Sequence, residues 1–357
     1  MVARNLGLSS ASFLLKLWEY IFRRLFLLVF VLIGVTIIVF FLSQVLMDPL
    51  ALYLTDRTRA TAIPAIVAYY HLNDPWPIRY AVYLSNLLKG DWGYSRSVDE
   101  PVFQALLQNF PATIELAAAA MLWTLIVGIP AGIVSALKNN KLPDHISRLV
   151  ALTGVSMPVF WLGLLLQLFF FYYLHTLGLP NLPSNGIDDG TLLLQYPITR
   201  ITGIPVLDTL VTGNWVMFED SLAHLILPSF ALGFVNLGVI MRITRSSMLE
   251  VFRQDYITLA RSKGLPERVV IYKHALKNAL IPTVTVAGLA LATMLAGAPL
   301  TETVFAWPGI GHLAVEAIGK NDAPLIMGFT LLSSLVLVLA NLVADILYAL
   351  LDPRIKY

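Results

Sequence analysis

The sequence contains no cysteine among its 357 residues. Disulfide bonds, thiolate metal sites and a cysteine nucleophile are therefore excluded, and thiol usage gives no information on the redox compartment. Charged residues are scarce as well, at 13% of the chain against about 25% in soluble domains. With 57% hydrophobic residues and a mean hydropathy of +0.75, the chain has too little polar surface for a soluble globule, which indicates a membrane protein.

Motifs for nucleotide hydrolysis and zinc catalysis are also missing. A phosphate-binding loop closes in Gly-Lys-Ser/Thr, whereas the one Gly-Lys pair, Gly319-Lys320, is followed by Asn321. No His-Glu-x-x-His motif occurs, and we expect His224 and His312 to be packing or interfacial residues. No large basic domain stands apart for nucleic acid. We therefore expect a non-enzymatic chain that binds no obligatory cofactor or metal.

Six stretches are long and apolar enough to cross a bilayer, which requires about 20 such residues. They are Leu25–Met47, Ala112–Leu137, Leu149–Leu174, Leu222–Met241, Leu280–Thr301 and Leu325–Leu350. The first is too long for the core of a signal peptide, so we expect it to be retained. Two carboxylates, Glu115 and Asp345, lie within these runs near their ends. Charged groups in spans are candidates for function, but we favour structural pairing with a neighbouring base.

The distribution of Lys and Arg predicts the orientation of the spans. Segments 1–24, 138–148, 242–279 and 351–357 together hold 17 of the 24 basic residues, while the opposite segments hold 7. Because basic loops stay in the cytoplasm, both termini are expected inside a plasma (inner, cell) membrane. Helical spacing of apolar residues over 12–24 predicts a short interfacial helix before the first span, 25–47. Residues 351–357 form the predicted cytoplasmic tail.

Two segments on the outer side carry structure of their own. Within 48–111, apolar residues recur at helical spacing from Val102 to Phe110, which predicts a helix lying along the outer face. Residues 178–220 are rich in Gly, Pro, Asp and Thr and predict an ordered loop rather than a span.

A basic, polar segment over 242–280 separates two of the most apolar runs. Gly264 followed by Pro266 predicts a helix stop, because Gly adopts the left-handed C-terminal position and Pro prevents continuation. A second helix is expected from Glu267, with Val269, Tyr272, Leu276 and Ala279 on one face. A helix, a sharp turn and a helix between two spans form an element suited to contact with another subunit.

The order of several fragments resembles the permease subunits of binding-protein-dependent ABC importers, in the dipeptide, oligopeptide and nickel branch. The fragments include "GDWGYSRSVDEPVFQALLQNFPATIELA" (90–117), "MPVFWLGLLLQ" (157–167), "MRITRSSMLEVFRQDYITLARSKGLPERVVIYKHALKNALIP" (241–282) and "ETVFAWPGIGHLAVEAI" (302–318). The resemblance implies an all-α membrane protein with the type I permease fold of six transmembrane helices. It places a five-helix core at 112–350.

In that family the 242–280 loop carries a coupling helix that docks on the ATPase subunit. The resemblance assigns this role to Asp255, Ala260, Arg261, Gly264, Leu265, Pro266, Arg268, His274 and Asn278. Thr258-Leu259-Ala260 departs from the Glu-Ala-Ala that opens the general motif, which leaves the individual contacts open. Candidates for the pathway or its gating are Glu115, Pro299, Glu302, Trp307 and Asp345, although structural pairing stays the favoured role for Glu115 and Asp345.

The resemblance also implies partners. It predicts a second homologous permease subunit, two ATP-binding subunits that hold ATP and Mg²⁺, and an extracytoplasmic solute-binding protein, all at the lipid bilayer. The solute is expected to be a peptide, although oligosaccharides and nickel stay open. The alternative is a secondary transporter or channel that is not driven by ATP. Such proteins usually carry ionisable groups or broken helices at the midplane, where charge is scarce here.

Overall fold

The computed structural model describes residues 10–46, 50, 54 and 58–351. Its first part contains α1 (Ser10–Leu46), a 3₁₀ turn (Ala60–Ala62), α2 (Ile63–Tyr69), α3 (Trp76–Leu88), the antiparallel strands β1 (Tyr94–Ser95) and β2 (Glu100–Pro101), α4 (Val102–Leu137), α5 (Leu142–Ser156), α6 (Val159–Leu166), the π-helical turn η4 (Gln167–Tyr173) and α7 (Leu174–Thr176). Its second part contains α8 (Gly190–Gln195), α9 (Pro205–Thr212), α10 (Trp215–Val251), α11 (Asp255–Ser262), α12 (Glu267–Val269), the π-helical turn η5 (Val270–Ala275), α13 (Leu276–Leu295), α14 (Pro299–Val304), α15 (Ile310–Gly319) and α16 (Ala323–Leu351).

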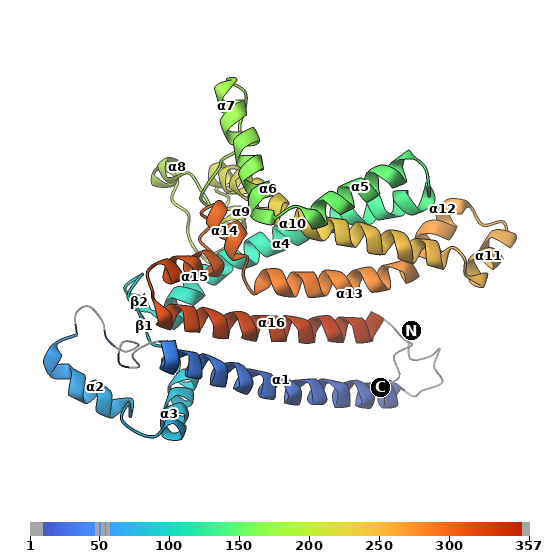
Figure 1. The fold of residues 1–357 in the computed structure, drawn as a ribbon. Helices are drawn as coiled ribbons and strands as arrows, with labels where there is room; N and C mark the ends of the chain where they lie inside the picture. The colour runs from blue at the N-terminus through green and yellow to red at the C-terminus, as the bar shows by residue number, and fades with distance from the viewer. Residues whose placement is uncertain (1–9, 47–49, 51–53, 55–57, 352–357) are drawn as a thin grey trace.

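Six of these helices, some formed by consecutive elements, are long and apolar enough to cross a membrane. They are Phe22–Leu42, Val102–Leu137, Val159–Thr176, Trp215–Val251, Glu267–Leu295 and Ala323–Ile346. Figure 1 shows α1, α16, α13 and α10 running beside one another, with α4 packed on α10. The predicted all-α membrane fold with six spans is confirmed. We call the two ends of this bundle the α11 end and the hairpin end, after α11 and the β1–β2 hairpin.

The helices α4 and α10 form the most extensive pair in the bundle. Glycines allow their backbones to approach closely: a Cβ on Gly233 would lie 2.6 Å from the carbonyl oxygen of Ala120. A Cβ on Gly132 would lie 2.8 Å from the carbonyl oxygen of Met241. Small residues at such contacts are how membrane helices gain packing energy without a hydrophobic driving force. The Thr124 hydroxyl also donates to the Gly233 carbonyl at 3.0 Å.

The predicted surface helix over 102–110 is not a separate element. It forms the first part of α4, which continues without a break through Pro111 into the predicted second span. The side chains of Val102 and Leu106 are buried against α15 and α16. Pro removes one backbone donor, which packed neighbouring helices can offset in a span. Tertiary packing of the apolar stripe therefore keeps the helix continuous through the proline.

Another proline breaks the predicted third span. α5 ends at Ser156, Met157 is extended with ψ 125°, and α6 begins at Val159 after Pro158. The residue before a proline is sterically disfavoured in the α region, which explains the break. Residues 149–156 therefore belong to α5, which packs on α10, and α6 to α7 leave the bundle at a steep angle (Figure 1).

Three further boundaries differ from the predictions. α10 exceeds the predicted fourth span at both ends. α13 ends at Leu295 rather than Thr301, because Gly297 turns the chain with φ +110° and Pro299 starts α14. The predicted interfacial helix at 12–24 is continuous with the first span in α1. Apart from Leu351, the predicted tail 351–357 lies outside the described residues.

Candidate functional site

The loop at the α11 end turns where the sequence predicted. Gly264 follows α11 with φ +72°, and its N–H donates to the Arg261 carbonyl at 2.9 Å. Pro266 then occupies the position before α12. A left-handed glycine followed by a proline is a favourable way to end one helix and redirect the chain into the next. Leu265, between them, is 37% exposed.

An ion pair closes this turn from the side. The Arg261 guanidinium donates to both carboxylate oxygens of Glu267, at 2.7 and 3.3 Å, and lies 5.7 Å from the centre of the Phe252 ring. Two parallel hydrogen bonds fix the orientation of such a pair as well as its distance. Arg261 was expected among the residues that meet a partner; in this chain its charge is engaged across the turn. We call this pair the turn brace.

One face of α11 is anchored to the bundle. Ile257 and Ala260 are buried in a cluster that includes Ile133 of α4 and Met248 of α10. The amide of Asn278, on α13, donates to the Tyr256 hydroxyl at 2.8 Å. The position of α11 is therefore fixed by the ends of three long helices.

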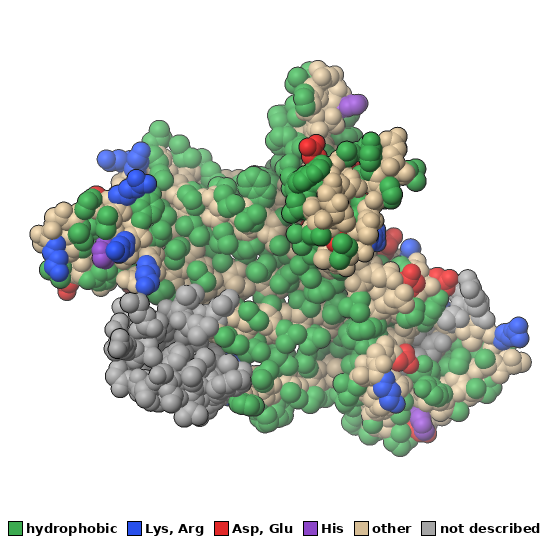
Figure 2. Space-filling model, turned by 180° about the vertical axis from the view of Figure 1, so that it is seen from behind, with side chains coloured by type: hydrophobic (Ala, Val, Ile, Leu, Met, Phe, Trp, Pro, Cys, Tyr) green, Lys and Arg blue, Asp and Glu red, His purple; other side chains and the backbone are tan. Residues whose placement is uncertain are grey.

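The opposite face of α11 and the turn are open. Asp255, Arg268 and the apolar Leu259, which is 56% exposed, face solvent in this chain. Several Lys and Arg side chains gather at this end of the molecule, on the left in Figure 2. An exposed leucine surrounded by charges on a braced helix forms a compact surface for protein contact.

The face predicted for the helix after Glu267 is only partly right. Ala279 is buried as predicted, but Tyr272 is 55% exposed, and Val270, Ile271 and Ala275 are buried in addition. The π-helical turn η5 explains the difference, because a wider turn rotates the residues that follow relative to an α-helical pattern. His274 is half-buried within η5.

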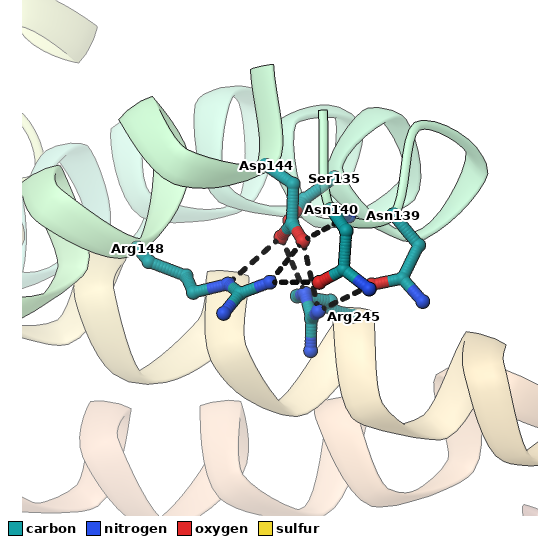
Figure 3. A network of polar contacts seen from close by, with 6 residues as sticks. All are labelled: Ser135, Asn139, Asn140, Asp144, Arg148 and Arg245. Carbon is teal, nitrogen blue, oxygen red and sulfur yellow. Dashed lines mark hydrogen bonds and ion pairs between the residues drawn. The ribbon is translucent and has the colours of Figure 1, made fainter. Parts of the chain in front are cut away.

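A polar network that the sequence analysis missed lies beside this loop (Figure 3). Asp144, in the first turn of α5, has a fully buried side chain. Its carboxylate accepts hydrogen bonds from the Ser135 hydroxyl of α4 at 2.6 Å, from Arg245 of α10 at 2.6 and 3.0 Å, and from Arg148.

The asparagines of the α4–α5 loop complete this network. The backbone N–H of Asn140 donates to Asp144 at 2.8 Å, and its side-chain oxygen accepts from Arg148 at 3.0 Å. The side-chain oxygen of Asn139 accepts from Arg245 at 2.8 Å. We call the six residues of this network the Asp144 clamp: Ser135, Asn139, Asn140, Asp144, Arg148 and Arg245. It joins α4, α5 and α10 where α11 is anchored, since Ala136 and Met248 belong to the α11 cluster.

Electrostatics keep the clamp charged. The guanidinium groups of Arg148 and then Arg245 hold the pKa of Asp144 far below its ordinary value, against the opposing effect of burial. A buried carboxylate with two bases carries a surplus positive charge, which matches the basic character of the α11 end. The spacing of Asp144 and Arg148, four residues apart at a helix start, could have indicated one pair. Arg245 lies 101 residues from Asp144 in the sequence, and no local pattern around it predicts that it binds this carboxylate.

A second polar cluster lies at the hairpin end. The buried Glu302 accepts hydrogen bonds from the backbone N–H of Ala298 at 3.1 Å and of His312 at 2.9 Å, and from the Thr113 hydroxyl at 3.2 Å. It thus satisfies one free donor before α14 and one at the start of α15, where a carboxylate is favoured. Burial raises the pKa of Glu302, and these hydrogen bonds oppose that shift. Gly309 is required, because a Cβ there would lie 2.5 Å from the carboxylate.

The remaining predicted pathway residues occupy structural positions. Trp307 is fully buried, and its ring N–H donates to the Ala112 carbonyl at 2.8 Å. One oxygen of Glu115 accepts from the N–H of Val206 at 2.9 Å, and the other is buried with no hydrogen bond in the structure. Asp345 pairs with Arg24 at 3.1 Å, which is the pairing with a neighbouring base that we favoured. Pro299 opens α14.

The arrangement of six spans, a braced polar loop and an apolar core corresponds to a known family. Residues 128–357, more than half of the chain, match the family described as binding-protein-dependent transport system inner membrane component. The chain belongs to this family. Its structure is the type I fold of ABC permeases, as the sequence resemblance implied.

Named relatives of this permease chain match over nearly its whole length. The chain is 44% identical to the dipeptide transport system permease protein DppB of Alkalihalophilus pseudofirmus, over 95% of this chain and 99% of the relative. It is 44% identical to the probable D,D-dipeptide transport system permease protein DdpB of Escherichia coli, covering 95% and 97%. The oligopeptide transport system permease protein AppB of Bacillus subtilis is 33% identical, covering 95% and 99%.

The chemistry available to this permease chain at the two ends differs. In the described part of the chain, no group of three or more His, Asp or Glu side chains is arranged to hold a metal ion. At the α11 end, the buried charges join helices and the exposed face offers a protein contact. At the hairpin end, the buried carboxylates Glu302 and Glu115 hold short helices against α4.

Proposed function

We propose that this permease chain forms half of the translocation pathway of an ATP-driven importer of dipeptides or other short peptides. The names of its relatives support the peptide class. A second homologous permease subunit forms the other half of the pathway, and two ATP-binding subunits hold ATP and Mg²⁺. The chain itself hydrolyses no ATP and needs no cofactor of its own.

The observation that carries this proposal is the geometry of α11. A coupling element has to transmit force, so it needs a rigid link to the spans and a free face for its partner. Ile257 and Ala260 provide the link, the turn brace fixes the following turn, and Leu259 with Arg268 lie on the free side. The Asp144 clamp lies at the same helix ends, so a movement of α11 is passed to α4, α5 and α10 together.

The orientation that follows places the α11 end in the cytoplasm and the hairpin end outside. The surplus of Lys and Arg at the α11 end supports this orientation. The segment 178–220, with α8 and α9, then faces the solute-binding protein, and the permease lies in the plasma membrane with both termini inside. A gradient-driven transporter is not favoured, because such a protein has no use for an exposed coupling helix.

The absence of cysteine makes orientation directly testable. We expect a cysteine at Lys141, which is exposed beside the clamp, to react only with a reagent on the cytoplasmic side. A cysteine at Leu194 of α8, 87% exposed, should react only from outside. Labelling of both from one side would contradict the six-span orientation.

Assembly and energy source require a second experiment. We expect the chain, co-expressed with a homologous permease and ATP-binding proteins from the same organism, to co-purify with two ATP-binding subunits. Vesicles that hold this complex and the solute-binding protein should accumulate labelled dialanine only when ATP is present on the α11 side. Accumulation that follows an ion gradient and ignores ATP would refute the proposal in favour of a secondary transporter.

A further inference from the structure

A small cavity lies between α8 and α9 in the segment 178–220. Its volume is about 240 Å³, and its lining includes Leu193, Ile198, Pro205, Asp188, Arg200 and Asp208. At roughly 30 Å³ per water molecule, this space equals about eight waters. It therefore has the size of a short peptide end or a similar small solute, and it is too small for a protein segment with structure of its own.

The three charged residues of the cavity differ in how they are engaged. Both oxygens of Asp208 are occupied, because they accept hydrogen bonds from the backbone N–H groups of residues 201–203 and from the Thr202 hydroxyl, at 2.7–3.1 Å. In the described part of the chain, no hydrogen bond or ion pair occupies the carboxylate of Asp188 or the guanidinium of Arg200. The cavity thus presents one available acid and one available base.

The charges of Asp188 and Arg200 affect each other through space, without a direct ion pair between them. Burial, and then the charge of the Asp220 carboxylate, raise the pKa of Asp188, and the charges of His224 and Arg200 act in the opposite direction. Two carboxylates, Asp188 and Asp208, and one guanidinium, Arg200, line the cavity, so an added ammonium group would balance its charges. Arg200 offers the planar donor pair that binds a carboxylate with two parallel hydrogen bonds.

The walls of the cavity are fixed to the ends of the spans. Next to Asp188, Ile187 packs against the buried cluster of Ala112, Leu116, Leu225 and Trp307, and so does Val206, next to Pro205. The N–H of Asp189 donates to Asp220 of α10 at 2.7 Å, and the N–H of Val206 donates to Glu115 of α4 at 2.9 Å. Asp208 fixes the turn that carries Arg200. The backbone on which Asp188 and Arg200 stand is thus held by the fold.

We propose that this cavity binds a small zwitterionic solute, with its ammonium group on Asp188 and its carboxylate on Arg200. A dipeptide with free ends has this chemistry. The apolar Leu193, Ile198 and Pro205 then contact the part between the ends. The inference rests on the proposed function, and it adds a subsite on the permease itself that selects for unmodified peptide ends.

Binding to the full chain in lipid nanodiscs, without the solute-binding protein, tests this subsite. The probes are dialanine, N-acetyl-dialanine, which lacks the ammonium group, and dialanine amide, which lacks the carboxylate. We expect dialanine to bind at least about tenfold more tightly than either analogue, because each analogue loses one charge-assisted hydrogen-bonded contact. Broadening of the peptide methyl signals in NMR spectra measures the affinities.

Two variants test the contacts with the ammonium end and the carboxylate end of the peptide one at a time. Arg200→Gln should remove the preference for dialanine over its amide and keep the preference over the N-acetyl form, and Asp188→Asn should do the reverse. A damaged fold would not produce this reciprocal loss. Arg59→Gln and Glu219→Gln, exposed positions that do not line the cavity, should keep both preferences.

Two outcomes would overturn the inference: equal binding of the three probes by the wild type, or full discrimination in both cavity variants. The experiments distinguish failure of the proposed function from failure of the subsite. If dialanine binds with the expected selectivity but vesicles show no ATP-driven uptake, the importer proposal is wrong and the subsite stands. If uptake is driven by ATP and the cavity variants discriminate as the wild type does, the subsite is wrong and the importer proposal stands.

Discussion

Replacement of Gly264 perturbs the turn after α11 without introducing a clash. A Cβ built on Gly264 meets no atom within 4 Å, so any effect comes from the backbone, which has φ +72°. A residue with a side chain costs about 1–2 kcal/mol in this left-handed conformation, although Asn visits it readily. A β-branched residue such as Val is the least suited. We therefore expect the order Gly, Asn, Ala, Val from least to most perturbed.

The free-energy cost of a side chain at position 264 can be compared with the free energies of the two interactions that stabilise the turn. The exposed turn brace contributes about 0.2–1 kcal/mol, and the single backbone bond from Gly264 to Arg261 about 0.5–1.5 kcal/mol. The cost of Val is of the same size, so the turn is expected to rearrange rather than to bear the strain. The buried spans do not depend on it. A change of 1–2 kcal/mol alters the population of the docking conformation by about 5- to 30-fold.

The assay is ATP-driven uptake and substrate-stimulated ATP hydrolysis in reconstituted vesicles, with membrane insertion measured alongside. Gly264→Val should insert normally, yet lose most of its uptake or its coupling to hydrolysis. Gly264→Asn is the matched control and should retain most of both. If the Val variant transports as the wild type does, or if Asn and Val are equally impaired, α11 is not the coupling element and our reasoning on the turn is wrong.

Three further predictions concern other parts of the chain. Arg261→Glu should weaken ATPase coupling about fivefold or less, which corresponds to the loss of an exposed ion pair of about 0.2–1 kcal/mol. The added Glu267→Arg should restore the coupling; no rescue would show that Arg261 acts on the partner instead. Asp144→Asn should lower the unfolding midpoint in detergent. Because the folded pKa of Asp144 is depressed, its stabilisation is present above the ordinary value of about 3.9 and is lost only as the pH falls below it, so a wild-type–variant difference that fades near neutral pH would contradict the clamp. Deletion within 184–198 should reduce uptake and leave assembly with the ATP-binding subunits intact; unchanged uptake would show that the α8 segment is dispensable.

Much of the fold could be predicted from local sequence because its driving force is local. Six runs of apolar residues specify six spans, since each run gains transfer free energy by itself whatever its neighbours are. Gly264 and Pro266 likewise specify a turn through their own backbone preferences. Of the fragments that carried the family resemblance, 157–167 and 241–282 lie in these same elements, whereas 302–318 lies in the short helices α14 and α15.

Prediction from local sequence failed at two prolines, because the same residue type ends a helix at one position and lies inside a continuous helix at the other. Pro158 breaks a helix, whereas α4 continues through Pro111. The difference lies in what surrounds each proline: residues before Pro111 are buried against α15 and α16, and that packing holds the helix together. The π-helical turn η5 similarly changed the buried face after Glu267, which an α-helical pattern could not foresee.

The candidate site divides in the same way. The sequence by itself determined the place of the loop, its turn at Gly264 and the basic character of its end. Only the tertiary structure decided that Arg261 braces the turn, that Asp144 joins Arg245 across 101 residues, and that Asp188 and Arg200 share a cavity. The physical reason is distance: backbone preference and apolar transfer act on each residue where it stands. An ion pair or a cavity exists only after packing has brought remote segments together.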